Sequence, residues 1–450
     1  MRKKTGNYAH LIVWVLLTTL FAACGKSSPL VSSTAPVVFY AHMVALRNGT
    51  SYAWGANTYG QLGNNDTTGA TQFAPQLVVG FAATGMAGIS AGGTHTLAFK
   101  NNSSAYAWGN NGYGQLGNYT VTPSAVPVQV YKYALDKVTL NGPLTRVAAV
   151  SAGGNHSLAI VNDGTVWAWG DNALGQLGDG TIISRIAAVQ IQNPLTGSPL
   201  VASLISAGGS HSLAMLANNT AMSWGYNYFG QLGNAVTTTP VFGAYSTSFN
   251  SIVPTVVVED APNYPTLASV TAIAAGGSHS LFITAATSTT AATVWSCGYN
   301  YWGQLGDGTV ITRNHGVVPV IGLPTANGVT PIAVAAGLDH SLVLMSDGSV
   351  WAWGSNYSGQ LGNGAPLLTI TGVLTPVQVM VNFTQPLTGV TTIIAIGNNS
   401  FAVDSSGKLW AWGDNTFGQL GQGGTSTTDL NFATPVLGFS TGSVIYPPSP

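Results

Sequence analysis

"YNYWGQLGDGT", residues 299–309, combines three aromatic side chains, an asparagine and a Gln-Leu pair enclosed by glycines. A similar segment occurs seven times in the 450-residue chain. The copies are WGANTYGQLG (54–63), WGNNGYGQLG (108–117), WGDNALGQLG (169–178), WGYNYFGQLG (224–233), CGYNYWGQLG (297–306), WGSNYSGQLG (353–362) and WGDNTFGQLG (412–421). Their glutamines are Gln61, Gln115, Gln176, Gln231, Gln304, Gln360 and Gln419, at intervals of 54 to 73 residues. Self-similarity at this spacing predicts an array of repeated structural units.

A second repeated element precedes each copy and contains a histidine. Five versions are SAGGTHTLAF (90–99), SAGGNHSLAI (151–160), SAGGSHSLAM (206–215), AAGGSHSLFI (274–283) and AAGLDHSLVL (335–344). The terminal versions, FYAHMVAL (39–46) and AIGNNSFAV (395–403), depart from the pattern. One column is therefore occupied by His42, His95, His156, His211, His279 and His340, with Asn399 in the seventh place.

The segments between these elements predict short antiparallel strands. Asn48-Gly49, Asp163-Gly164 and Asp347-Gly348 are typical of type I′ hairpins. The "TVWAWG" segment (165–170) that follows one of them alternates in the manner of a strand, and further strands are expected at "VPVQVY" (126–131) and "TPVQVM" (375–380). A sheet of three or four strands cannot bury both faces alone, whereas several sheets around an axis can. The predicted fold is all-β, a seven-bladed β-propeller, with residues 440–448 expected to add a strand to the first blade.

The His-Ser-Leu-Ala, Trp-Gly and Gly-Gln-Leu-Gly elements resemble the repeats of the family named for the regulator of chromosome condensation (RCC1-type). The resemblance spans about residues 37–440 and implies a seven-bladed propeller. Cys297 at a tryptophan position, Asn399 at a histidine position and the missing Ala-Gly-Gly before His42 depart from the repeat. The expected repeats are approximately 37–81, 82–130, 145–195, 200–260, 268–322, 330–381 and 391–440, within a propeller domain over 37–450.

The N-terminus predicts an exported bacterial lipoprotein. Three basic residues at 2–4 precede the apolar run "LIVWVLLTTLFA" (11–22), which is too short for an ordinary membrane-spanning helix. "LFAAC" then ends in Cys24. We expect a signal peptide over 1–23, lipidation of Cys24 and a flexible tether over 24–36; an ordinary secretory signal cleaved nearby is the alternative. The expected location is the bacterial cell envelope, as an outer-membrane lipoprotein or exported to the surface.

Charge and acid content narrow the function classes. Charged residues make up 6% of the chain and the net charge is −1, so no basic field for nucleic acid is expected. The single glutamate, Glu259, and the scattered aspartates show no paired-carboxylate or metal-ligand spacing. The histidines, each repeated in its own blade, are interpreted as structural groups that fix neighbouring backbone turns, and the seven glutamines as parts of the scaffold. No cofactor and no metal are expected, and a lone buried Cys297 is expected to pack as a small apolar side chain.

The positions that vary within the repeated loop are the candidates for recognition. Between the loop asparagine and the Gly-Gln-Leu-Gly segment, tyrosine occupies the first position in three successive copies. The predicted contact patch contains Tyr228, Phe229, Tyr301, Trp302 and Tyr357, and its partner would be a protein or a glycan. The insertions at 235–268 and 131–144 are further candidates.

These features favour a non-catalytic protein-binding propeller, expected to be a monomer. The family resemblance implies an alternative, guanine-nucleotide exchange on a small GTPase, which would use an aspartate beside the histidine column; Asp339 alone occupies that place. A third interpretation is a glycan-active enzyme.

Overall fold

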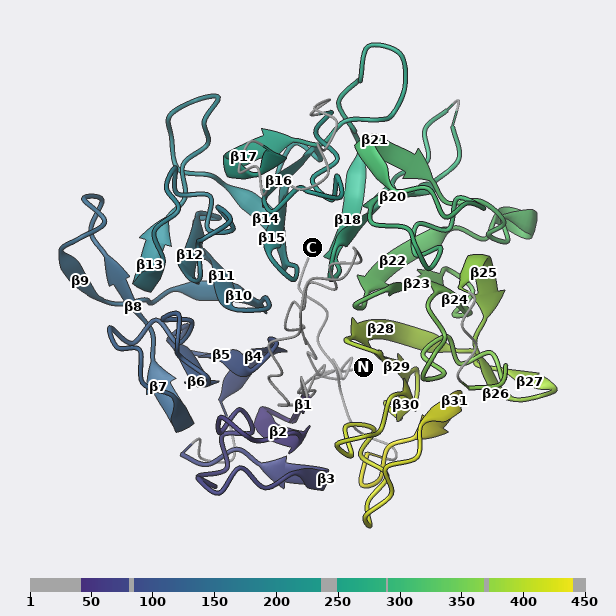
Figure 1. The fold of residues 1–450 in the computed structure, drawn as a ribbon, viewed down its shortest axis with the longest axis horizontal. Helices are drawn as coiled ribbons and strands as arrows, with labels where there is room; N and C mark the ends of the chain where they lie inside the picture. The colour runs from purple at the N-terminus through teal and green to yellow at the C-terminus, as the bar shows by residue number, and fades with distance from the viewer. Residues whose placement is uncertain (1–41, 81–84, 236–248, 289, 368–371, 440–450) are drawn as a thin grey trace, which may run out of the picture.

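The computed structural model describes residues 42–80, 85–235, 249–288, 290–367 and 372–439. Within them, seven mainly antiparallel blade sheets are arranged around one axis, and one further two-stranded hairpin is present (Figure 1). The predicted seven-bladed β-propeller is thereby confirmed. The leader, Cys24, the tether and residues 440–448 lie outside the described residues.

The first three blades show the plan of the molecule. Blade 1 contains β1 (His42–Arg47), β2 (Thr50–Gly55) and β3 (Gln72–Leu77). Blade 2 contains β4 (Met86–Ala91), β5 (His95–Lys100), β6 (Ala105–Gly109) and β7 (Ser124–Gln129). Blade 3 contains β10 (Val147–Ala152), β11 (His156–Val161), β12 (Val166–Gly170) and β13 (Arg185–Gln190), and β13 also pairs with the hairpin of β8 (Tyr131–Tyr133) and β9 (Leu140–Pro143).

The remaining four blades repeat this order. Blade 4 contains β14 (Ala202–Ala207), β15 (His211–Leu216), β16 (Ala221–Gly225) and β17 (Ser251–Val256). Blade 5 contains β18 (Val270–Ala275), β19 (His279–Thr284), β20 (Thr293–Gly298) and β21 (Arg313–Pro319). Blade 6 contains β22 (Pro331–Ala336), β23 (His340–Met345), β24 (Val350–Gly354) and β25 (Val373–Gln378), preceded by a 3₁₀ turn, η2 (Ala326–Gly328). Blade 7 contains β28 (Val390–Ile396), β29 (Asn399–Asp404), β30 (Leu409–Gly413) and β31 (Leu430–Pro435), after the small hairpin of β26 (Met380–Asn382) and β27 (Gln385–Pro386).

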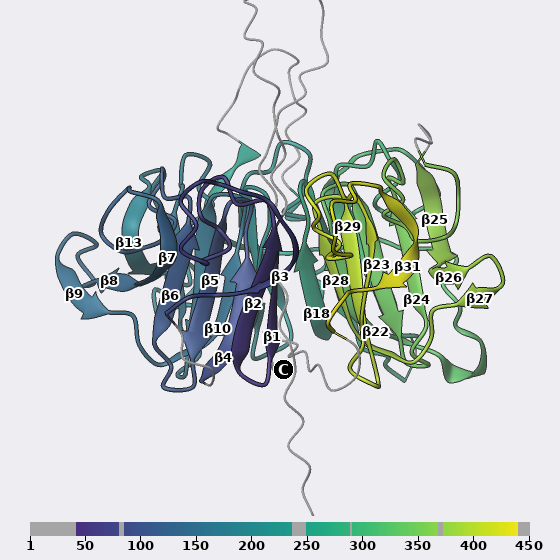
Figure 2. The same ribbon diagram turned by 90° about the horizontal axis from the view of Figure 1, so that it is seen from below.

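The strand order gives the disc two different faces (Figure 2). Each histidine that begins a second strand pairs with the glycine that ends the third, as His156 does with Gly170. The turn before the histidine and the long loop after the Trp-Gly step therefore lie on one side, which we call the loop face. The turns that join the histidine strand to the tryptophan strand lie on the opposite side, the hairpin face.

The hairpin-face turns differ from the expectation at two of three places. Asn48 and Gly49 both have positive φ, 52° and 74°, as a type I′ turn requires. Asp163 and Asp347 do not, and only the glycine that follows each of them does. Their carboxylates accept the backbone N–H two residues later, from Thr165 and Ser349, which stabilises a three-residue turn that ends in the left-handed glycine.

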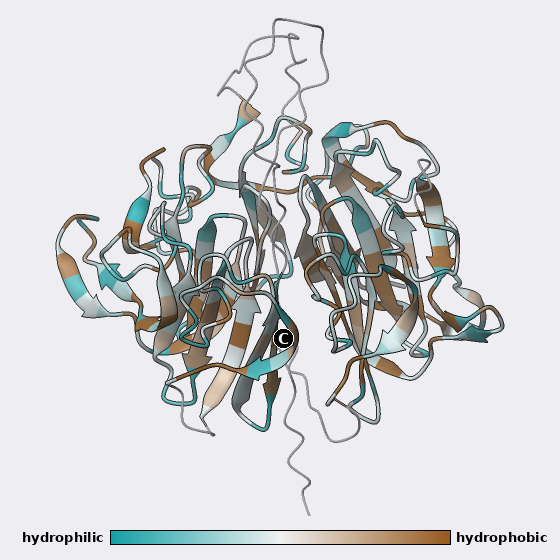
Figure 3. Cartoon of the chain, turned by 60° about the horizontal axis from the view of Figure 1, so that its bottom comes forward, coloured by the Kyte–Doolittle hydropathy of each residue, from teal (hydrophilic) through white to brown (hydrophobic). Residues whose placement is uncertain are grey.

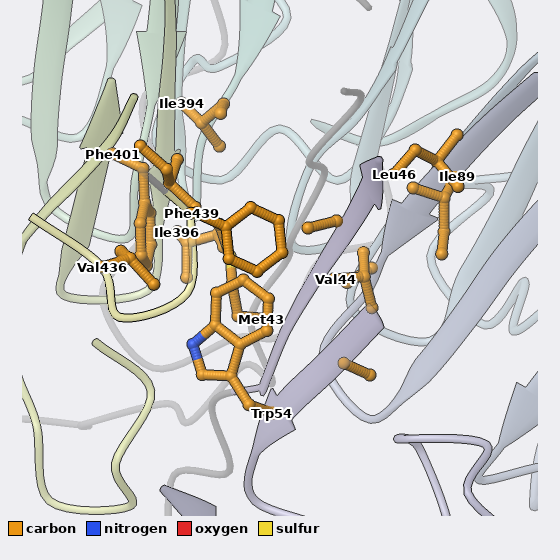
Figure 4. Packing of buried hydrophobic residues seen from close by; sticks show 14 of the residues in the cluster. Met43, Val44, Leu46, Trp54, Ile89, Ile394, Ile396, Phe401, Val436 and Phe439 are labelled. Carbon is orange, nitrogen blue, oxygen red and sulfur yellow. The ribbon is translucent and has the colours of Figure 1, made fainter. Parts of the chain in front are cut away.

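Apolar packing lies between the blades rather than inside any one of them. Apolar residues line the strands and also appear on several loops (Figure 3). Each buried cluster combines residues of neighbouring sheets; one joins Trp54 of blade 1 to Phe401 of blade 7 and includes Phe439, which is 2% exposed (Figure 4). Neighbouring blades therefore stabilise each other, as expected for sheets too small to fold alone.

Candidate functional site: the loop face

A repeated set of hydrogen bonds holds the loop face rigid. In all seven copies the loop asparagine accepts the N–H of the leucine five residues later, with N–O distances of 2.9–3.1 Å. In all seven, the glutamine Oε1 accepts the N–H of the residue two positions earlier, at 2.7–3.1 Å. The glutamines that do so are Gln61, Gln115, Gln176, Gln231, Gln304, Gln360 and Gln419, and each is at most 1% exposed. The residues between each asparagine and its glutamine are thus presented on a fixed backbone.

The histidines connect each blade to the next. Their Nε2 atoms lie 2.8–3.0 Å from a hydroxyl of the following blade, in the pairs His42–Thr96, His95–Ser157, His156–Ser212, His211–Ser280, His279–Ser341 and His340–Ser400. Each hydroxyl in turn donates to the glutamine carbonyl of the histidine's own blade, as Ser157 does to Gln115 at 2.9 Å. A hydroxyl has one proton to donate, so the histidine must be the donor at Nε2. The expected bonds were to backbone turns; the ring instead bonds to a side chain of the neighbouring blade.

The backbone carbonyls of the glutamines form the other half of each junction. Those of Gln61, Gln115, Gln176, Gln231, Gln304 and Gln360 accept the hydroxyl of the next blade, at 2.7–2.9 Å. The carbonyl of Gln419 instead accepts the indole N–H of Trp54 in blade 1, at 2.9 Å. The glutamines predicted to be structural therefore act twice, since the side chain shapes the loop and the carbonyl joins the next blade.

Tryptophan donates to the same carbonyl at other junctions as well. Trp169 donates to the carbonyl of Gln115, and Trp353 to that of Gln304, both at 2.9 Å. Cys297 takes this place between blades 4 and 5, with its sulfur 3.5 Å from the carbonyl of Gln231. Burial raises the pKa of the Cys297 thiol, which keeps the thiol protonated.

The junction between blades 7 and 1 lacks both the histidine and its hydroxyl partner. Asn399 replaces the histidine of blade 7, and its amide donates to the carbonyl of Asp414 in its own blade. Met43 replaces the hydroxyl residue of blade 1. The sequence shows only that Asn399 departs from the histidine pattern. The structure shows that Asn399 lies at the junction of blades 7 and 1, where Met43 also replaces the hydroxyl partner.

Four of the five predicted contact residues belong to a continuous row of aromatic rings on blades 4 and 5. Phe229 contacts Tyr228 with ring centroids 5.0 Å apart, and Tyr301 contacts Trp302 at 5.1 Å. Two rings outside the predicted patch, Tyr226 and Tyr299, complete the row. We call Tyr226, Tyr228, Phe229, Tyr299, Tyr301 and Trp302 the aromatic row.

Tyr226 and Tyr299 occupy the position between the Trp-Gly step and the loop asparagine. Tyr226 stacks on Tyr228 with an interplanar angle of 9°, and Tyr299 stacks on Tyr301 at 11°. Phe229 and Tyr299, with ring centroids 4.7 Å apart, join the two blades. Tyrosine at this position in two successive copies was the sequence signal that could have identified them.

Tyr301 is the most exposed member of the row, at 64%. Tyr357 is 49% exposed on the next blade, but within the described ranges no ring contact is found between it and the row. The predicted patch is therefore a row over two blades, with Tyr357 as a separate exposed ring.

Asp339 lies beside the row, in the turn between β22 and β23. Gln304 joins the two: its Oε1 accepts the N–H of Trp302 at 3.0 Å, and its Nε2 donates to Asp339 Oδ1 at 2.9 Å. Desolvation raises the pKa of the Asp339 carboxyl to about 7.

The histidines do not gather around a common centre, and the described residues contain no group of three or more His, Cys, Asp or Glu side chains that could hold a metal ion. In the part of the chain that is described, no helix has the length and hydropathy needed to cross a membrane.

A family model for the RCC1-like domain matches residues 37–312, more than half of the 450-residue chain. The chain belongs to the RCC1-like domain family. Models of the RCC1 repeat also match residues 292–344 and 347–403.

Relatives with this domain have different overall sizes. The ultraviolet-B receptor UVR8 of Arabidopsis thaliana is 26% identical over 393 residues, which cover 87% of this chain and 78% of the receptor. The E3 ubiquitin-protein ligase HERC2 of Homo sapiens is 28% identical over 382 residues, which cover 84% of this chain and 7% of the ligase.

Solved structures share the fold. Prp20p of Saccharomyces cerevisiae, described with its binding properties to Gsp1p and histones, superposes with a TM-score of 0.66 at 22% identity, over 88% of this chain and 87% of that one. Human WBSCR16 gives a TM-score of 0.64 at 20% identity, over 82% and 86% of the two chains.

Proposed function

We propose that the chain is a non-catalytic protein-binding propeller, held at the bacterial cell envelope by a lipid on Cys24, with the loop face as its binding surface. The aromatic row is the observation that carries the binding part of this proposal, whereas the anchor rests on the sequence around Cys24. Tyrosine and tryptophan provide large contact areas with few rotatable bonds, and they are enriched among the residues that dominate binding energies. The repeated asparagine and glutamine bonds already fix the backbone beneath them, so binding costs little additional ordering.

The fold relatives are consistent with a partner that is a protein. The solved structures include yeast RCC1 (Prp20) with Kap60 bound to it. With the proposed lipid anchor, the chain would bind its partner outside the cytoplasm, either in the envelope or at the cell surface.

The test is capture of partners from envelope fractions by the mature chain. Changing Tyr228 and Tyr301 to Ala is expected to weaken retention of the partner about tenfold to thirtyfold, because two ring contacts of the row are lost. Tyr113→Ala is the matched control: Tyr113 is an exposed aromatic in the same loop of blade 2, outside the row. Equal capture by all three proteins would contradict the assignment of the row, and Tyr357→Ala shows separately whether that ring takes part.

Two further measurements bear on the remaining parts of the proposal. Cys24→Ser should move the chain from the membrane to the soluble fraction if a lipid anchors it. The exchange alternative rests on Asp339, and accelerated nucleotide release from a small GTPase that is lost in Asp339→Asn would replace simple binding with exchange.

A further inference from the structure

The two faces of the disc carry different charges. The described loop-face segments contain seven aspartates (Asp66, Asp171, Asp179, Asp307, Asp339, Asp414 and Asp429) and the arginines Arg185 and Arg313. The hairpin-face segments contain Arg47, Lys100, Arg146 and Lys408 against Asp163, Asp347 and Asp404. The formal charge of these segments is therefore −5 on the loop face (two minus seven) and +1 on the hairpin face (four minus three). Lys132, Asp136, Lys137, Glu259 and Asp260, in the connections between blades, are counted on neither face. The raised pKa of Asp339 makes its charge partial near neutral pH.

The two loop-face arginines are already paired. Arg185 donates to Asp179 through two nitrogens, at 2.9 and 2.7 Å, and Arg313 pairs with Asp307 at 2.8 and 2.7 Å. Lys137 reaches the edge of this face from the β8–β9 hairpin and donates to the carbonyl of Asp179 at 2.6 Å. Five of the seven aspartates have no ion-pair partner among the described residues.

The aromatic rings show the same asymmetry. Three lysines lie over rings outside the aromatic row: Lys100 over Tyr106, Lys132 over Trp167 and Lys408 over Trp410, with 4.8, 5.5 and 3.9 Å from nitrogen to ring centroid. Among the described residues, no cation lies over the rings of Tyr228, Phe229, Tyr301 or Trp302. The row is flanked by Asp171 of blade 3 on one side and Asp339 of blade 6 on the other.

We infer, building on the proposed function, that the protein partner presents lysine or arginine side chains to the loop face. A cation placed over the exposed Tyr301 ring gains cation–π attraction, and aspartates on both neighbouring blades add favourable charge interactions. An acidic partner would meet uncompensated carboxylates at the same place, which gives the surface its selectivity.

The test uses octalysine, octaglutamate and a neutral Gly-Ser octapeptide as probes of the mature chain. Octalysine is expected to bind at least about tenfold more tightly than octaglutamate, and its affinity should fall several-fold between about 0.05 and 0.5 M salt. The double change Asp171→Asn with Asp339→Asn should weaken octalysine binding about fivefold, since asparagine retains the hydrogen-bond acceptor but loses the charge. The matched control, Asp163→Asn with Asp347→Asn, removes the same charge from the hairpin face.

Equal effects of the two double variants, or equal binding of all three peptides, would overturn this inference. Tyr301→Leu separates ring attraction from apolar contact, because leucine keeps the apolar area and removes the π face. An envelope protein could be captured through the aromatic row with an affinity that changes neither with salt nor with the aspartate substitutions. That result would support the proposed binding function and contradict the cationic partner.

Discussion

Lowering the pH from 7 to 5 is expected to remove most of the folding stability of the propeller. Six histidines are fully buried, and desolvation lowers the pKa of each from 6.5 to about 3. Each Nε2 has a hydroxyl partner, but no Nδ1 has one within the described residues. A protonated ring would therefore bury a charge and an N–H group without an acceptor.

The sign follows from proton binding. Between pH 6.5 and about 3 the unfolded chain binds protons at these histidines and the folded chain does not, so stability falls as the pH falls. At pH 5 the loss is about 2 kcal/mol for each histidine and about 12 kcal/mol for six. Asp339 gains stability as the pH falls, because its folded pKa of about 7 lies above its unfolded value. This gain offsets the loss of stability from only about one histidine. The remaining loss is comparable with the whole stability of a typical domain, about 5–15 kcal/mol.

Denaturant unfolding across pH 4.5–7.5 measures this loss. His340→Asn is the informative variant, since asparagine occupies the same column at Asn399, and it should reduce the pH slope by about one sixth. A stability that stays constant down to pH 4.5 would show that the rings find acceptors when protonated.

Changing Phe282 to Ala is expected to cost about 3–5 kcal/mol, the usual range for removal of a fully buried phenylalanine. The position three residues after the histidine is small in the other blades: Ala45, Ala98, Ala159, Ala214, Val343 and Ala402. Phe282 is the exception, and it shares a buried cluster with Cys297, the one residue that replaces tryptophan. We expect the Phe282 ring to fill the space that a tryptophan at position 297 would take.

A double-mutant cycle tests this exchange of volume. Cys297→Trp alone should destabilise by about 1–3 kcal/mol through overpacking. Combined with Phe282→Ala, it recreates the pair formed by Ala214 and Trp224 in blade 4, and stability should return to within about 1.5 kcal/mol of the parent. The reciprocal pair Ala214→Phe with Trp224→Cys is the matched control. Energies that simply add within about 0.5 kcal/mol would contradict the coupling.

The fold could be predicted from the sequence because every blade uses the same residues for the same bonds. A glutamine or an asparagine that recurs seven times identifies a loop without any knowledge of its neighbours. The recognition surface was predicted only in part, because it depends on contacts between blades. Tyr226 and Tyr299 enter the row by stacking on residues that the sequence did identify, whereas Tyr357, in the same column as Tyr301, is left outside it.

Contacts between side chains at the junctions also could not be predicted from the sequence. Cys297 could be recognised as a departure, but its compensation by Phe282 requires knowing that the two side chains lie in one cluster. Likewise, the turn at Asp163 depends on a side-chain bond to Thr165, which the dipeptide Asp-Gly does not specify.

The apolar contact between blades 7 and 1 has a consequence for the order of assembly. If the blades dock in chain order, the junction between blades 7 and 1 is the last to form. Six of the joints require a histidine, a hydroxyl and a carbonyl to align. At the final one Met43 and Asn399 remove that requirement, and the indole bond of Trp54 is accompanied mainly by apolar contact with Phe401 and Phe439. Apolar contacts depend less on orientation than hydrogen bonds do. Docking at this junction therefore requires fewer groups to be aligned than docking at the other six.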